Sequence, residues 1–145
     1  MSMPTPISDL GHLLAALSPQ RHPGTWAWCT LALQAALDAD AQPIATMRED
    51  EGLSVVVADE KAAARGWPVA FRAAWITLRV HSDLHAVGLT AAVSEALARA
   101  GIACNVIAGT QHDHLFVPVE RAGDAMRVLA ALQAGGANAG VSSET

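Results

Sequence analysis

The chain has 145 residues, of which 52% are apolar and 16% are charged, and its formal net charge is −5. This composition excludes an intrinsically disordered chain, and the length suits one compact unit or two small fused halves. The nine Lys and Arg residues are spread singly, which argues against a nucleic-acid partner. No apolar run approaches the ~18 residues that cross a bilayer, and Met1–Leu10 lack the pattern of a secretion signal. We therefore expect a cytoplasmic protein without membrane contact.

The first half of the chain predicts two helices and three strands. The predicted elements are a helix over residues 8–17, strands over residues 25–33, 44–48 and 53–58, and a helix over residues 59–66. Leucines at spacings of three, one and three mark the first helix, and Ser8 is its expected N-cap. Trp67-Pro68 then interrupts regular structure. We therefore expect an N-terminal half over residues 1–68.

The second half predicts three strands and two helices. The predicted elements are strands over residues 73–80, 102–108 and 114–119, and helices over residues 89–100 and 121–132. The residues that follow are rich in Gly, Ala, Ser and Asn and show no periodicity. We therefore expect a C-terminal half over residues 69–133 and a flexible tail over residues 134–145. The whole predicts an α+β fold in the order α-β-β-β-α-β-α-β-β-α.

The polar loop 81–88, which joins a predicted strand to a predicted helix, is the first candidate site. Gly88 opens the helix, and the unpaired N–H groups of the first turn favour a carboxylate. Asp83 would bind an ammonium group, so that the loop offers the two opposite anchors that a free amino acid requires. Alternatively, Gly88 only turns the chain and Asp83 or Ser82 caps the helix. Asn105, between apolar neighbours, is expected to bond either the loop backbone or a ligand.

Two further polar clusters have weaker interpretations. His112, Asp113 and His114 are weak metal candidates, because imidazoles and a carboxylate bind zinc. The sequence offers no recognisable spacing for further ligands, so we expect a hairpin turn, no metal and no cofactor. Arg48, Glu49 and Asp50 lie at a second predicted turn, which is either a solvated turn, a docking contact or a second possible ligand site. No nucleophile elbow or phosphate loop is present, and we expect no enzyme activity.

The cysteines and tryptophans indicate core positions. Cys29 and Cys104 lie in predicted strands, and we expect both to be reduced and buried. The four tryptophans predict core or subunit contacts; they are Trp26, Trp28, Trp67 and Trp75. A tryptophan at a sheet edge would favour a homodimer.

Several stretches of this sequence resemble the ACT domain. They are Ala86–Ser94, Gly101–Ala108 and His112–Pro118 in the second half, with Ala45–Leu53 in the first. The chain looks like the short bacterial ACT-domain proteins that were once classed as a domain of unknown function, and it is similar to the regulatory part of aspartate kinases. The resemblance implies a ferredoxin-like βαββαβ unit that senses an amino acid. The second half lacks a last strand after the helix that ends near Leu132. That strand must come from the N-terminal half, which implies two interlocked ACT-like halves.

The resemblance also implies where a ligand binds, namely at the loop from first strand to first helix and at the facing strand. The implied ligand residues are His81, Ser82, Asp83, Leu84, Val87, Gly88, Leu89, Asn105, Val106 and Ile107. We expect a non-catalytic regulatory module that binds a small ligand, an amino acid, and that acts as a homodimer on a regulated enzyme. The alternatives are a structural interaction module without a ligand, and a metal site or enzyme built on the histidines.

Overall fold

The computed structural model describes residues 9–32 and 37–142, and the chain folds as two compact units. One unit combines the two ends of the chain, up to His22 and from Trp75 onward; we call it the terminal unit. The other spans Pro23–Ala74, and we call it the central unit. The boundaries of these units differ from those of the predicted halves over residues 1–68 and 69–133. The division into those halves stays a prediction. Strand β5 (Phe71–Leu78) begins in the central unit and ends in the terminal unit.

The terminal unit is a four-stranded antiparallel sheet with three helices, as far as the described residues go. Its remaining elements are α1 (Leu10–Ala15), β1 (Pro19–Arg21), α3 (Leu89–Arg99), β6 (Asn105–Ala108), β7 (Asp113–Pro118), the short 3-10 turn η2 (Val119–Arg121) and α4 (Ala122–Ser142). The strand order is β1-β5-β7-β6. Taken from β5 onward the elements follow the βαββαβ order of a ferredoxin-like unit, with β1 as the last strand.

Strand β1 is the strand that the second half of the chain lacks. It pairs antiparallel with β5, so that Pro19 lies opposite Leu78 and Arg21 opposite Ile76. The prediction that the N-terminal half supplies this strand is confirmed. Its location at residues 19–21 was not predicted, because three residues that begin with proline carry no strand periodicity.

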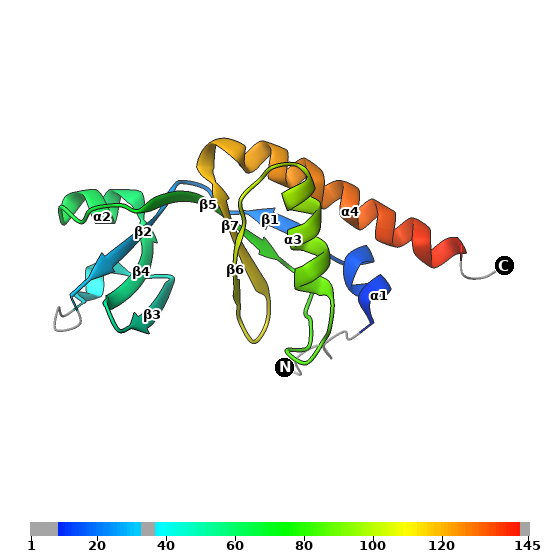
Figure 1. The fold of residues 1–145 in the computed structure, drawn as a ribbon, viewed down its shortest axis with the longest axis horizontal. Coiled ribbons are helices and arrows are strands. Elements are labelled where there is room, and N and C mark those ends of the chain that lie inside the picture. Colours follow the sequence, from blue (N-terminus) through cyan, green and yellow to red (C-terminus); the bar gives the residue numbers. More distant parts are fainter. Residues whose placement is uncertain (1–8, 33–36, 143–145) are drawn as a thin grey trace. The chain divides into compact units, whose positions relative to one another are not determined.

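The core of the terminal unit lies between its sheet and its helices. Ile76 and Leu78 on β5 and Leu115 and Val117 on β7 point to one face of the sheet and are buried there. The residues between them, Thr77 and Phe116, are buried as well, so both faces of these strands are covered. The helices contribute the buried side chains of Leu13, Leu89, Val93, Leu97, Ala125 and Leu129. In Figure 1, α1 and α3 both lie against α4, and residue contacts join each of these pairs. Phe116, on the other face of β7, is also buried, and its ring stacks with that of Trp75.

Helices α1 and α4 are held together at the end of α1. Asp9 is the N-cap of α1 and accepts a hydrogen bond from the His12 N–H at 3.0 Å. Ser8, the expected N-cap, lies outside the described residues. At the other end, the Gln133 side chain donates to the Ala15 carbonyl and accepts from the Ser18 N–H, both at 3.0 Å. Gln133 therefore satisfies two backbone groups that the end of α1 leaves open.

Helix α4 continues to Ser142, so the predicted end at Leu132 was wrong. Gly136 is buried against α1, where an added Cβ would lie 2.7 Å from the Cβ of Leu14. The absence of a side chain at Gly136 lets α1 pack directly on α4, and this packing stabilises a helix in a stretch of small residues that shows no helical periodicity. Flexibility of residues 134–145 stays a prediction. No helix in the described part of the chain has the length and apolar character needed to cross a membrane.

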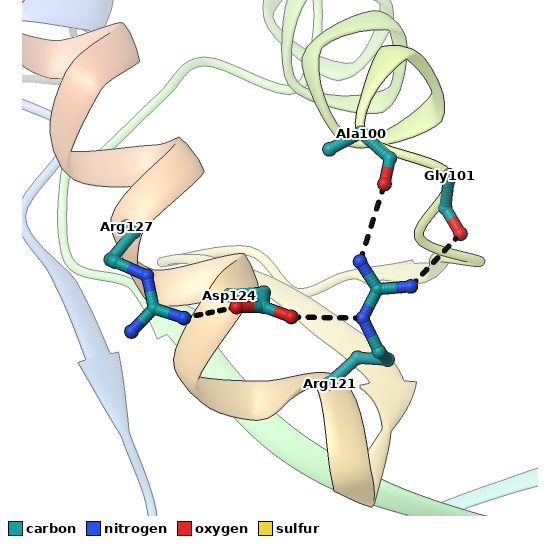
Figure 2. A network of polar contacts seen from close by, with 5 residues as sticks. All are labelled: Ala100, Gly101, Arg121, Asp124 and Arg127. Carbon is teal, nitrogen blue, oxygen red and sulfur yellow. Dashed lines mark hydrogen bonds and ion pairs between the residues drawn. The ribbon is translucent and has the colours of Figure 1, made fainter.

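An arginine joins the end of α3 to the start of α4, as Figure 2 shows. The Arg121 guanidinium donates to the carbonyl oxygens of Ala100 at 3.2 Å and Gly101 at 3.4 Å. Its Nε donates to Asp124 at 3.0 Å, and Arg127 also donates to Asp124. Because the last carbonyls of a helix lack intrahelical partners and carry partial negative charge, a cation here is favourable.

The central unit has the same strand arrangement. Its elements are β2 (Trp26–Leu31), the 3-10 turn η1 (Ala39–Ala41), β3 (Ala45–Glu49), β4 (Gly52–Ala58), α2 (Asp59–Ala64) and the first part of β5. The order is β3-β4-β2-β5, which places two sequential ferredoxin-like patterns on one chain. The predicted fold class, an α+β ferredoxin-like fold with antiparallel sheets packed against helices, is confirmed.

One face of the central unit's sheet forms a small core. Ala27, Cys29 and Leu31 on β2 pack with Val55 and Val57 on β4, and Trp67 packs against them. Cys29 is buried as predicted, whereas Cys104 in the terminal unit is only partly buried. Alternate residues point to the other face, where the rings of Trp28 and Phe71 meet edge to face at 6.2 Å.

Candidate functional site

The loop between β5 and α3 is shaped by Asp83. The Asp83 carboxylate accepts a hydrogen bond from the His85 N–H at 2.8 Å, and its carbonyl accepts one from the Ala86 N–H at 2.9 Å. These bonds form a local turn of the kind that aspartate side chains favour. Asp83 therefore does not cap α3, and one of its oxygen atoms already has a backbone partner.

Helix α3 begins at a glycine rather than at a capping side chain. Gly88 is the N-cap with φ of 105°, a backbone conformation that favours glycine, and it lies against Leu10 of α1. Because glycine has no side chain, the N-cap residue itself leaves the first N–H groups of α3 without a side-chain cap. The predicted alternative, in which Asp83 or Ser82 caps the helix, was wrong. The first turn of α3 keeps the free donors that bind anions.

Asp113 is a buried carboxylate beside the same loop. Its side chain is at the start of β7 and only 8% exposed, and its Oδ2 accepts a hydrogen bond from the Ser82 hydroxyl at 3.3 Å. The sequence placed Asp113 with two histidines as a weak metal candidate. Strand alternation predicts the position of Asp113 better than the metal hypothesis does, because it places Asp113 on the face of β7 opposite His114. Asp113 and Ser82 thus meet at the loop, which the sequence did not predict.

The loop also exposes apolar side chains. Leu84 is 63% exposed and Val87 is 85% exposed, whereas Leu89, the first residue of α3, is buried in the core. His81 is partly buried. Single exposed apolar residues are common, but two in one eight-residue loop form a surface that another molecule can cover.

The strand that was expected to face the loop lies at the edge of the terminal unit's sheet. β7 separates β6 from β5 in the strand order. Asn105 is exposed and lies opposite Phe116, whose ring in turn stacks on Trp75, so it is level with the beginning of this unit's part of β5. Asn105 is thus exposed although its sequence neighbours are apolar, and it does not lie level with loop 81–88. Val106 and Ile107 are half-buried and lie opposite Leu115 and His114.

The histidines of the weak metal hypothesis have different surroundings. His112 precedes β7, and its Nδ1 lies 3.5 Å from the Val80 carbonyl. The His114 Nδ1 lies 3.1 Å from the Trp75 indole nitrogen and 3.0 Å from the Thr77 hydroxyl. Within residues 9–32 and 37–142, no group of three or more His, Cys, Asp or Glu side chains is arranged to hold a metal ion.

The second possible site lies on the hairpin of β3 and β4. Glu49 pairs with Gly52 across a tight turn, and Arg48, Glu49 and Asp50 are all exposed. Glu49 accepts a hydrogen bond from Ser54. This arrangement is typical of a solvated turn and provides no enclosed surface that would favour a ligand.

Comparison with known proteins identifies two matching family models. Residues 5–74 match one model described as an ACT domain, and residues 71–131 match another with the same description. No curated protein matches the sequence at a significant level.

Solved structures give similar folds. A protein of unknown function from Vibrio cholerae, described as a possible transport protein, is 43% identical, with a TM-score of 0.77 over 86% of this chain and 95% of that one. A protein from Agobacterium tumefaciens is 19% identical, with a TM-score of 0.63 over 79% of this chain and 87% of that one. E. coli aspartokinase III, solved in complex with aspartate and ADP, is 13% identical. Its TM-score is 0.56 over 79% of this chain and 32% of that one. At such low identities the last two structures show a shared fold alone.

Proposed function

Because the chain belongs to the ACT-domain family, we propose that it is a non-catalytic regulatory module that binds a free amino acid at loop 81–88. Proteins of this family are generally regulatory modules that bind small ligands, often amino acids. The specific ligand and its position on this chain are our proposal. Ligand binding would then change the activity of a partner enzyme that the module regulates.

The observation that carries the proposal is the pairing of opposite anchors at one loop. The first turn of α3 starts at Gly88 without a side-chain cap among the described residues, and its N–H groups suit a carboxylate. Asp113 is a buried carboxylate that already bonds Ser82 of the loop and suits an ammonium group. A free amino acid carries both groups on one carbon atom, so it matches this pair.

Asp83 has a different part in the proposed site. Since one of its oxygens is bonded to the His85 backbone, its first contribution is the shape of the loop. Leu84 and Val87 would then close over the ligand and lose the exposure that they have in the free protein. A hydrophobic contribution from two partly covered side chains amounts to a few kcal/mol at most.

A homodimer is the second part of the proposal. In the described part of the terminal unit, β6 pairs with β7 on one side and ends the strand order. An edge strand offers unpaired backbone groups to a second copy of the chain. The oligomeric state is measured directly by light scattering, and a monomer at all concentrations would contradict this part.

The ligand is tested by thermal-shift measurements of the purified protein with each of the twenty amino acids, followed by calorimetry. A ligand at 100 times its Kd stabilises the folded state by about 2.7 kcal/mol, which is several degrees in Tm for a domain of this size. A flat response to every amino acid would favour a structural interaction module instead.

Two isosteric variants then separate the roles of the carboxylates. Asp83→Asn keeps an oxygen that can accept from His85, so it should retain most of the affinity. Asp113→Asn removes the buried charge, and we expect at least about a tenfold loss, because a lost charged hydrogen bond costs about 1.5–3 kcal/mol. Glu60→Gln, an exposed change on α2, is the matched control. Equal binding by Asp113→Asn and the wild type would exclude Asp113 as the ammonium anchor.

A further inference from the structure

Four side chains form a hydrogen-bonded cluster on the face of the terminal unit's sheet opposite Ile76 and Leu78, a face on which Thr77 is also buried. Trp75 and Thr77 alternate with the core residues Ile76 and Leu78 along β5, so they point to the opposite face. The His22 ring, just after β1, stacks on Trp75 with 3.6 Å between ring centroids. His114 on β7 approaches both residues of β5. The cluster therefore joins three strands through side chains alone.

The direction of each hydrogen bond follows from the indole. A tryptophan Nε1 can only donate, and its acceptor is the His114 Nδ1 at 3.1 Å. His114 Nδ1 therefore carries one lone pair. The Thr77 hydroxyl oxygen lies 3.0 Å from it, and we assign the hydroxyl proton to the same lone pair as a second, shared donor, because two lone pairs would otherwise face each other. Thr77 has no second proton, so the His22 Nε2 at 2.7 Å must donate to the Thr77 oxygen. Neutral His114 is thus the tautomer that carries its proton on Nε2.

We propose that His22, Thr77 and His114 form a proton-sensitive latch that holds β1 on the sheet while His114 is neutral and loosens it when His114 gains a proton. Protonation places a hydrogen on Nδ1, where two donors already point. Trp75 then loses this acceptor and Thr77 must reverse its hydroxyl. His22 is affected in turn, because its Nε2 bonds the same hydroxyl.

The surroundings of the cluster also oppose protonation. Burial lowers the pKa of His114 first, His112 and Arg79 lower it further, and Asp113 opposes them. Burial likewise lowers the pKa of His22, with smaller contributions from Arg79 and His114. From the strand on the far side, Asn105 and Ile107 are uncharged. Arg79 is held over β1 by a hydrogen bond from its Nε to Gln20 at 2.5 Å.

The latch matters for β1 because this strand is short. It pairs with β5 over three residues, fewer than the five or six of an average strand. The flanking backbone bonds are His22 N–H to the Trp75 carbonyl at 2.9 Å and Arg79 N–H to the Ser18 carbonyl at 3.1 Å. If the cluster loosens β1, the hydrogen-exchange protection of the His22 and Arg79 amides should therefore fall.

The first test uses the wild-type chain. Long-range ¹⁵N NMR at about pH 7.5 should show His114 protonated on Nε2 and titrating below the ordinary value of about 6.5. A neutral His114 with its proton on Nδ1 would overturn the proposal, and this result does not depend on any variant folding.

The second test measures hydrogen exchange of the His22 and Arg79 amides at about pH 7.5 and pH 4.5. Protection relative to amides inside α3 should fall on acidification, by about tenfold for each unit by which the folded pKa of His114 lies below the unfolded one. The His114→Asn variant places an oxygen that does not titrate near the Nδ1 position, so it should keep protection at both pH values. Trp75→Phe removes one opposing donor and should move the transition to higher pH.

Two controls complete the design. His22→Gln retains a donor to Thr77, and its pH dependence should persist because His114 is intact. His12→Asn changes an exposed histidine on α1 and should behave as the wild type. An equal loss of protection in His114→Asn and wild type would overturn the latch.

Discussion

Arg121 shows how one side chain can end one helix and begin another. Its guanidinium donates to the carbonyls of Ala100 and Gly101, which directly follow α3, and Asp124 in the first turn of α4 orients it (Figure 2). Hydrogen bonds from Arg121 first, and from Arg127 second, lower the pKa of Asp124. A planar guanidinium suits this arrangement because it can reach two acceptors and a carboxylate at once.

This arrangement predicts a pH-dependent contribution to stability. Because the folded pKa of Asp124 lies below its unfolded value, near 3.9, the contribution is present above that value and is lost as the pH falls through the folded pKa. Asp124→Asn should therefore lower the free energy of unfolding at about pH 6.5 and have a smaller effect at about pH 2.5. Urea unfolding at both pH values measures this. Glu60→Gln is the control, and an Asp124→Asn effect of the same size at both pH values would contradict the prediction.

At the residue scale, the sequence located the loop but not the partners of its side chains. Gly88 was predicted to open the helix from its place before an apolar helical stretch, and it has a positive φ there. The pairing of Ser82 with Asp113 spans 31 residues, and such a contact depends on strand order. Periodicity gives the face of a side chain but does not identify its neighbour on the next strand.

At the element scale, α4 was predicted too short because its last turns are made of poor helix formers. Gly135 and Gly136 each lower helix propensity, and only tertiary packing offsets this. Gly136 faces α1, whereas Gly135 is exposed. An added Cβ at Gly136 would lie 2.7 Å from the Leu14 Cβ and 2.9 Å from the Ala15 nitrogen, and one at Gly135 would meet nothing within 4 Å.

The two neighbouring glycines therefore predict opposite effects of the same substitution. Gly135→Ala should stabilise the protein by up to about 1 kcal/mol through helix propensity. Gly136→Ala gains the same propensity but forces α1 away, and overpacking of this kind costs about 1–3 kcal/mol, so we expect a net loss. Chemical unfolding of both variants measures the difference. Stabilisation by both substitutions would mean that α1 does not rest on Gly136.

At the scale of the whole molecule, periodicity predicted most of the strands and the fold class but not how the chain is divided. β5 is a continuous strand whose first residues complete the central unit and whose last residues begin the terminal unit. A local pattern cannot show that division, because both parts alternate in the same way. The number of predicted strands did show that the N-terminal part supplies one strand to the second half. The second half has three predicted strands, whereas its resemblance to the ACT domain requires four.

The terminal unit should therefore fold without the central unit if its two pieces are joined. His22 lies opposite Trp75, since its N–H bonds the Trp75 carbonyl at 2.9 Å. The antiparallel neighbours β1 and β5 can thus be linked as a hairpin by two residues such as Asn-Gly, which favour a tight turn with the right twist. We expect a chain of residues 9–22, Asn-Gly and residues 75–142 to unfold cooperatively in urea and to give a dispersed NMR spectrum.

Residues 75–142 alone lack β1 and α1, which leaves the β5 edge unpaired and the α1-facing side of α4 uncovered. That fragment should aggregate or unfold without a cooperative transition. If it folds as well as the joined chain, β1 is not an integral strand of this unit.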